Sequence, residues 1–173
     1  RCSDAGVPRL YCLARRLMTK RDPFRPVDDE ARAQAAAMLS DARYGALGTL
    51  RDGLPVVTRA ALAPTRMGLL TLVSDLAAHA QAMRSAPQVS LMIGEPGRGD
   101  PLAHPRMTIA ATARFVDKAP HRDAYLSCQP KAALYIDFAD FNIVHLDIDS
   151  AELNGGFGKA YRLTKADLTL PQR

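Results

Sequence analysis

The sequence has no long apolar run. No stretch of its 173 residues approaches the ~20 apolar residues that span a bilayer, so an integral membrane protein is excluded and no membrane partner is expected. Regular apolar spacing also excludes low-complexity disorder for most of the chain. With 47% hydrophobic and 24% charged residues, the composition is that of a soluble globular protein, and the length suits one domain.

Cysteine is scarce, and the usual motifs of metal sites and nucleophilic enzymes are missing. Cys2, Cys12 and Cys128 form no CxxC pair, which argues against a disulfide framework or a structural zinc site and favours a cytoplasmic location. The four histidines show no HxxxH spacing, and there is no GxSxG nucleophile turn. The glycine-rich stretch before Lys159 lacks the Ser or Thr of a phosphate-binding P-loop, because Ala160 follows the lysine.

The positive charge is confined to one end of the chain. Residues 1–25 hold seven basic and two acidic residues, whereas residues 26–173 hold 16 of each. The body therefore offers no broad cationic surface, and no nucleic-acid partner is expected. We interpret residues 1–25 as a basic extension, disordered or non-native in part, in which Met18 is a natural start. Residues 26–173 are expected to form a single domain.

Apolar periodicity and turn signals predict a mainly β protein with peripheral helices. A first helix should follow Asp28, whose acidic neighbours suit a helix start. Asp52-Gly53 between two apolar runs indicates a β-hairpin. Strands are expected at 44–50, 54–62, 67–73, 89–93, 106–116, 141–148 and about 157–163, with further helices from Ser74 to Pro87 and over 120–135, broken at Pro130. This order disfavours a doubly wound sheet and favours antiparallel hairpins closing into a small barrel.

The junction between the third strand and the helix after it is the first candidate site. A helix N-terminus presents unpaired N–H groups and a partial positive charge that can hold a phosphate. Ser74 adds a hydroxyl there, and His79 adds an N–H group or a charge one turn later. The alternative is a plain capped helix, with Asp75 as the cap and His79 on the surface.

Two arginines in strands are the second candidates. Arg59 lies among apolar residues of the second strand, and Arg106 begins a later strand. Each either faces solvent or reaches a ligand phosphate, where the planar guanidinium forms paired hydrogen bonds. Aromatic residues at 135, 138 and 141 have no spacing of a stacking platform for nucleic acid.

The order of elements and several local segments resemble the FMN-binding split-barrel proteins related to pyridoxamine 5'-phosphate oxidase, and among them the haem-utilisation branch. The resemblance covers about residues 28–165 without a break. It is carried by Arg43-Tyr-Gly-Ala-Leu-Gly-Thr-Leu50, Thr58-Arg59-Ala60, Leu72-Val-Ser74-Asp-Leu-Ala-Ala-His79, Pro87-Gln-Val-Ser-Leu-Met-Ile93, Gly99-Asp-Pro-Leu-Ala-His-Pro-Arg106, Pro130-Lys-Ala-Ala-Leu-Tyr135 and Gly155-Gly-Phe-Gly-Lys-Ala-Tyr161.

This resemblance implies an antiparallel split β-barrel that forms a homodimer, with two small-molecule sites at the dimer interface. It further implies an FMN-binding oxidoreductase-like protein of unknown substrate, in which the flavin carries the electron chemistry. The cofactor-binding positions that it implies are Thr58, Arg59, Val73, Ser74, His79 and Arg106. We therefore expect Arg59, Ser74 and His79 to converge on one phosphate-sized pocket.

The chain departs from the oxidases in its cationic residues, which leaves other functions open. Pro64 stands where the oxidases carry a Lys, and Ala78-His79 stands where they carry an Arg-Lys pair. The alternative function is haem binding or haem utilisation on the same scaffold, with His79, His104 or His145 as iron ligands. The third hypothesis is a split barrel that acts without a cofactor.

Overall fold

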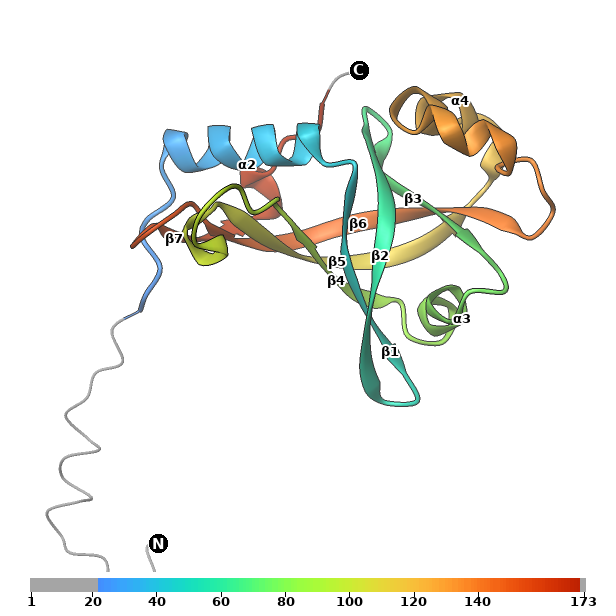
Figure 1. Cartoon of the computed structure of the whole chain (residues 1–173), viewed down its shortest axis with the longest axis horizontal. Helices are drawn as coiled ribbons and strands as arrows, with labels where there is room; N and C mark the ends of the chain where they lie inside the picture. The colour runs from blue at the N-terminus through green and yellow to red at the C-terminus, as the bar shows by residue number, and fades with distance from the viewer. Residues whose placement is uncertain (1–21, 172–173) are drawn as a thin grey trace, which may run out of the picture.

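The computed structural model describes residues 22–171, so our expectations for residues 1–21 lie outside the described residues. This part of the chain forms seven strands and three α-helices, with short 3₁₀ turns between them (Figure 1). Their bounds are α2 (Asp29–Asp41), β1 (Tyr44–Arg51), β2 (Leu54–Thr65), β3 (Gly68–Ser74), α3 (Ala78–Ser85), β4 (Gln88–Ile93), η1 (Pro101–Ala103), β5 (Arg106–Val116), α4 (Lys118–Cys128), η2 (Pro130–Leu134), β6 (Phe141–Asn154), β7 (Ala160–Thr164) and η3 (Lys165–Asp167).

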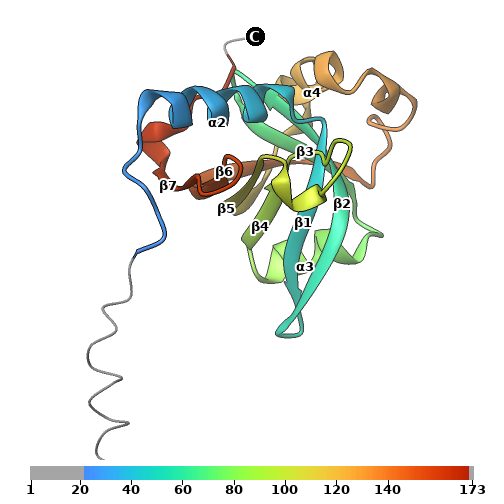
Figure 2. The same cartoon turned by 60° about the vertical axis from the view of Figure 1, so that its left-hand side comes forward.

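The strands form one antiparallel sheet that closes on itself. Their order is β3-β2-β1-β4-β5-β6-β7, and an additional pairing of β3 with β6 joins six of them into a barrel. β7 extends the sheet beyond β6, and the β1–β2 hairpin projects away from the barrel on the side opposite α2 (Figures 1 and 2). This confirms the prediction of a mainly β split barrel with peripheral helices.

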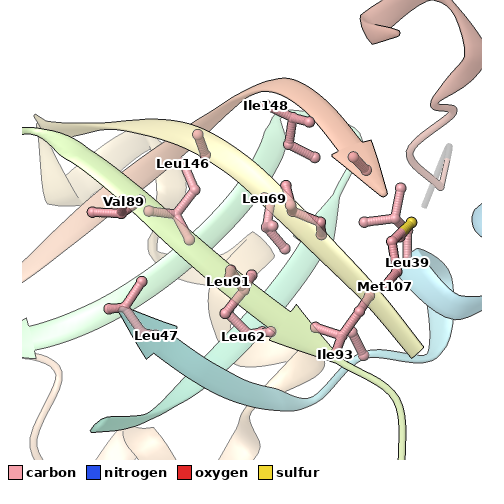
Figure 3. Packing of buried hydrophobic residues seen from close by; sticks show 14 of the residues in the cluster. Leu39, Leu47, Leu62, Leu69, Val89, Leu91, Ile93, Met107, Leu146 and Ile148 are labelled. Atoms are coloured by element: carbon pink, nitrogen blue, oxygen red, sulfur yellow. The ribbon is translucent and has the colours of Figure 1, made fainter. Parts of the chain in front are cut away.

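Alternating side chains fill the barrel, as Figure 3 shows. In β5, Met107, Ile109 and Ala111 are buried while the residues between them point outward, as the period of two requires. α2 closes one end of the barrel with Ala35 and Leu39, and the Asp28 carboxylate accepts its capping bond from the Ala31 amide at 2.8 Å.

A second apolar cluster lies outside the barrel. α4 and η2 cover the outer face of β2, β3 and β6, where Ala63, Leu70 and Ile143 meet the buried Tyr125. The predicted break at Pro130 between two helical pieces is confirmed. Cys128 borders this cluster as a half-buried free thiol.

Several element boundaries differ from the prediction, among them the end of β6, which runs to Asn154 and not to 148. β2 runs on to Thr65, so the turn before β3 shrinks to two residues, and the Thr65 hydroxyl accepts the Met67 amide at 3.1 Å. α3 begins at Ala78 and not at Ser74, because the Asp75 amide bonds to the Asp140 carbonyl at 2.8 Å. β7 begins at Ala160, after a turn that contains two glycines with positive φ.

The start of the described chain is tied to the sheet. The Arg25 amide donates to the Ala160 carbonyl at 2.8 Å, and Arg25 forms an isolated parallel bridge with Tyr161 of β7. Of the basic extension that we placed at residues 1–25, residues 22–25 thus belong to the described fold. Among the helices described, none has the length and apolar character that crossing a membrane requires.

Candidate functional site

The barrel is split where β2 leaves β3. The two strands pair only from Leu62↔Thr71 to Thr65↔Gly68. Beyond this ladder β2 continues along β1, and β3 continues along β6. Arg59, in the middle of β2, and Ser74, at the end of β3, each lie three residues past the last β2–β3 pair. α3 follows β3 directly and packs against β1, so it lies at this opening (Figure 1).

The α3 junction is fixed by hydrogen bonds that occupy the Ser74 side chain. Its hydroxyl donates to the Asp140 carboxylate at 2.6 Å and accepts the Leu76 amide at 3.1 Å. The N-cap residue Ala77 makes no side-chain cap bond, and its carbonyl accepts the Ala80 amide at 3.0 Å. Within the described residues, the amides of Ala78 and His79 are therefore the first-turn donors of α3 that remain open to an anion.

Asp75 does not cap α3, in contrast to our prediction. Its carboxylate accepts hydrogen bonds from Arg84 at 2.6 Å and from Asn142 at 2.9 Å, which draws it away from the helix start. These bonds, that from Arg84 above all, lower the pKa of Asp75 below its ordinary value.

His79 differs from the other three histidines in the hydrogen bonding of its ring nitrogens. Among the described residues it has no hydrogen-bond partner, whereas His104, His121 and His145 each hold a backbone carbonyl at 3.0 Å or less. His145 also faces the Asp147 carboxylate at 2.8 Å. Burial lowers the pKa of the half-buried His79. A neutral imidazole is therefore favoured at this position, with a nitrogen lone pair available to a ligand.

Arg59 lies in a cleft on the outer face of the sheet. Its guanidinium is 5.5 Å from the centre of the Tyr44 ring, and a side-chain hydrogen bond from Tyr44 to Glu95 raises the pKa of the tyrosine. Thr58 and Met92 also line this cleft, which measures about 340 Å³. A second cleft of about 380 Å³ shares Tyr44 and Glu95. The site is thus an open groove with one cation, one anion and a tyrosine between them.

Two other expected site residues, Val73 and Arg106, offer no free side chain to the α3 junction. Val73 is 2% exposed and packs in the barrel core, which leaves only its backbone to meet a ligand. Arg106 donates to the Leu102 carbonyl at 3.0 Å and so holds the loop before β5. Among the described residues, the lining of the Arg59 cleft includes neither Ser74 nor His79. Convergence of Arg59, Ser74 and His79 on one pocket therefore remains a prediction.

Three aromatic residues, set aside in the sequence, come together beside Ser74. Phe141 pairs with Ser74 across the β3–β6 ladder, and its ring lies 5.0 Å from that of Tyr135 and 6.3 Å from that of Phe138. Leu76, just after Ser74, is largely exposed. The α3 junction therefore has an apolar and aromatic border that the sequence spacing did not indicate.

Comparisons with known proteins agree with this architecture. The pyridoxamine 5'-phosphate oxidase family model matches residues 31–154. The heme oxygenase HutZ of Vibrio cholerae serotype O1 is 30% identical over 129 residues, which cover 68% of this chain and 71% of that protein. A heme binding protein from Mycobacterium smegmatis, of known structure, is 28% identical with a TM-score of 0.74 over 82% of this chain and 61% of its own.

A more distant structure shares the fold alone. Campylobacter jejuni ChuZ is 18% identical, with a TM-score of 0.73 over 86% of this chain and 65% of its own. The present chain thus spans less than two thirds of each of these two structures. Together with the closed six-stranded sheet, the matched family model shows that the chain belongs to the pyridoxamine 5'-phosphate oxidase family, as a split barrel close to its haem-utilisation branch.

Proposed function

We propose that this protein binds haem at the split between β2 and β3, as a member of the haem-utilisation branch. The observation that carries the proposal is His79: a half-buried imidazole whose neutral form is favoured by burial and which has no described hydrogen-bond partner. A neutral imidazole nitrogen is a common axial ligand of haem iron. Relatives at 30% and 28% identity, a heme oxygenase and a heme binding protein, support the same ligand class.

The residues around the split fit the chemistry of haem. An apolar macrocycle needs apolar neighbours, which Leu76 and the cluster around Phe141 provide at the α3 junction. Its carboxylates need a cationic or hydrogen-bonding partner, and Arg59 lies on β2 beyond the end of its pairing with β3. When bound, haem supplies the redox and oxygen chemistry, and the protein's part is to bind and orient it.

A hemin titration tests the assignment of His79. We expect wild type to develop a Soret band with saturable binding, and His79→Ala to shift the band and weaken affinity at least tenfold. His104→Ala is the matched control, because that ring is already held by the Arg98 carbonyl at 3.0 Å. Equal spectra and affinities for wild type and His79→Ala would remove His79 as the iron ligand. The absence of saturable hemin binding to wild type would exclude the proposed function.

FMN is the second candidate ligand, favoured by Arg59 and by the uncapped start of α3. In this case the protein would be a flavin-dependent oxidoreductase-like member of the family. Two features oppose it: Pro64 is buried where the oxidases carry a Lys, and the Ser74 hydroxyl is bonded to a carboxylate. FMN titration by fluorescence quenching decides the question. Tight FMN binding that Arg59→Ala weakens about 10- to 150-fold would favour the flavin.

A further inference from the structure

One acidic side chain, that of Asp140, is hydrogen-bonded to Ser74 just before the start of α3. The Ser74 hydroxyl has a single proton, and at 2.6 Å it donates that proton to the Asp140 carboxylate. This distance is typical of a strong O–H···O⁻ bond. The junction therefore presents a carboxylate beside Ser74, and the hydroxyl cannot at the same time donate to a second anion.

The charge of Asp140 is not compensated by a cation within the described residues. Its neighbour Asp75 is paired with Arg84 at 2.6 Å, and Asp137 is paired with Arg122 at 2.7 Å. Asp140 forms no such pair among residues 22–171; its carboxylate accepts only from Ser74. Lys118 on α4 donates its ammonium to the carbonyls of Ile136 and Phe138. Within the described residues, the Asp140 charge is therefore left without a paired cation beside the start of α3.

Asp140 is held in place and is not a freely rotating surface acid. Its backbone carbonyl accepts the Asp75 amide at 2.8 Å and the Asn142 side chain at 3.1 Å. Its side chain is bonded to Ser74, which is itself anchored by the Leu76 amide. A phosphate dianion that enters the junction would meet a fixed like charge, and displacing the carboxylate would break the bond to Ser74.

We propose that Asp140 is a specificity-determining residue, which excludes phosphate from the start of α3 and so selects against FMN and other phosphorylated ligands. The inference rests on the proposed function, since it explains why this split barrel takes haem and not the flavin nucleotide. A haem carboxylate bound at Arg59, on β2, does not require the Ser74 hydroxyl.

The test compares FMN, riboflavin and hemin on wild type and Asp140→Asn. We expect FMN to bind the variant about 10- to 100-fold more tightly, because a neutral amide removes the like charge and frees the Ser74 hydroxyl. Riboflavin, which lacks the phosphate, should show no gain, and hemin affinity should stay within about threefold. Asp123→Asn is the charge control: it removes the same charge from a side chain that is 95% exposed on α4.

Two further variants keep the outcome decisive. Asp140→Ser serves if the amide fails to fold, as judged by thermal melting, and Ser74→Ala in the Asp140→Asn background should reverse part of the FMN gain. The inference is overturned if FMN affinity does not rise in either Asp140 variant, if riboflavin gains equally, or if wild type already binds FMN tightly. Failure of wild type to bind hemin would instead overturn the proposed function, and the FMN-versus-riboflavin comparison would still decide the role of Asp140.

Discussion

Gly68 and His145 constrain each other across the seam between β3 and β6. Gly68 has a φ of +130°, and a Cβ at this position would coincide with the His145 imidazole. The ring cannot yield easily, because its Nε2 holds the Met67 carbonyl at 2.9 Å and its Nδ1 lies 2.8 Å from Asp147. The turn from β2 to β3 is therefore fastened to β6 at the point where the barrel closes.

We predict that Gly68→Ala costs about 2–4 kcal/mol of unfolding free energy, since it combines backbone strain with displacement of a packed ring. Gly53→Ala is the matched control. Its φ is +77° in the β1–β2 turn, but nothing lies within 4 Å of the added Cβ, so we expect about 1 kcal/mol from the backbone alone. Urea denaturation measures both. Equal losses at the two glycines would contradict the collision, and His145→Ala should partly rescue Gly68→Ala.

Part of the candidate site could be predicted at the level of residues. A two-residue Asp52-Gly53 turn fixes the hairpin register, which puts Arg59 diagonally across from Tyr44 on one face. That turn signal was present in the sequence. The Ser74–Asp140 bond could not be predicted, because it joins residues 66 positions apart through a strand pairing that only barrel closure creates.

At the scale of the element, α3 is held by a clamp and not by a capping residue. Arg84, in its last turn, bonds to Asp75 at 2.6 Å and stacks on Phe115 of β5 with the guanidinium 3.8 Å from the ring centre. Sequence reasoning predicted this helix from its apolar residues but misplaced its start. Local signals favoured Ser74 and Asp75 as the helix start, whereas the tertiary bonds to Asp140 and Arg84 keep both residues outside the helix.

We predict that this clamp gives α3 an acid-sensitive contribution to stability. The folded pKa of Asp75 is lowered below its ordinary 3.8, so the contribution is complete above that value and is lost as the pH falls through the folded pKa. Near neutral pH, Asp75→Asn should lower the melting temperature by about 1–3 °C, because the pair is exposed and screened. Melting curves from neutral to strongly acidic pH check this. A difference between wild type and variant that persists in strong acid would contradict the clamp.

At the scale of the whole molecule, one face of the sheet is covered by no helix within residues 22–171. α2 closes an end and α4 covers the outer side of β2, β3 and β6, but the outer face of β1, β2 and β4 carries partly exposed apolar side chains. Those of Tyr44, Leu50, Val57 and Met92 surround the small residues Ala46 and Gly48. Exposed apolar groups gathered on one sheet face are typical of surfaces that join protein subunits.

The closed barrel could be predicted from the sequence only in part. Strand count, hairpin order and the inward-facing residues of β5 follow from alternation, and all three agree with the structure. The length of β6 does not follow from alternation. Its 14 residues pair with β5 along one edge, and with β3 and then β7 along the other. The register of β6 against β5 also shifts at the bulge opposite Ala110 and Ala111. The alternation of buried residues is broken there, so the sequence pattern resembles two shorter strands.

We predict that this uncovered face joins two copies of the chain into a homodimer, with Arg59 and its ligand at the interface. Val57, 69% exposed on β2 two residues before Arg59, is the side chain to change. Val57→Glu should convert the dimer to a monomer at micromolar concentration in light scattering, because an unpaired charge would be buried in the contact.

Leu134→Glu is the control, since that side chain is as exposed but lies on η2 over the opposite layer. Unchanged melting of the Val57→Glu monomer, with lost hemin binding, would place the ligand at the interface. A monomeric wild type would exclude the dimer, and retained hemin affinity in the monomer would place the site within one subunit.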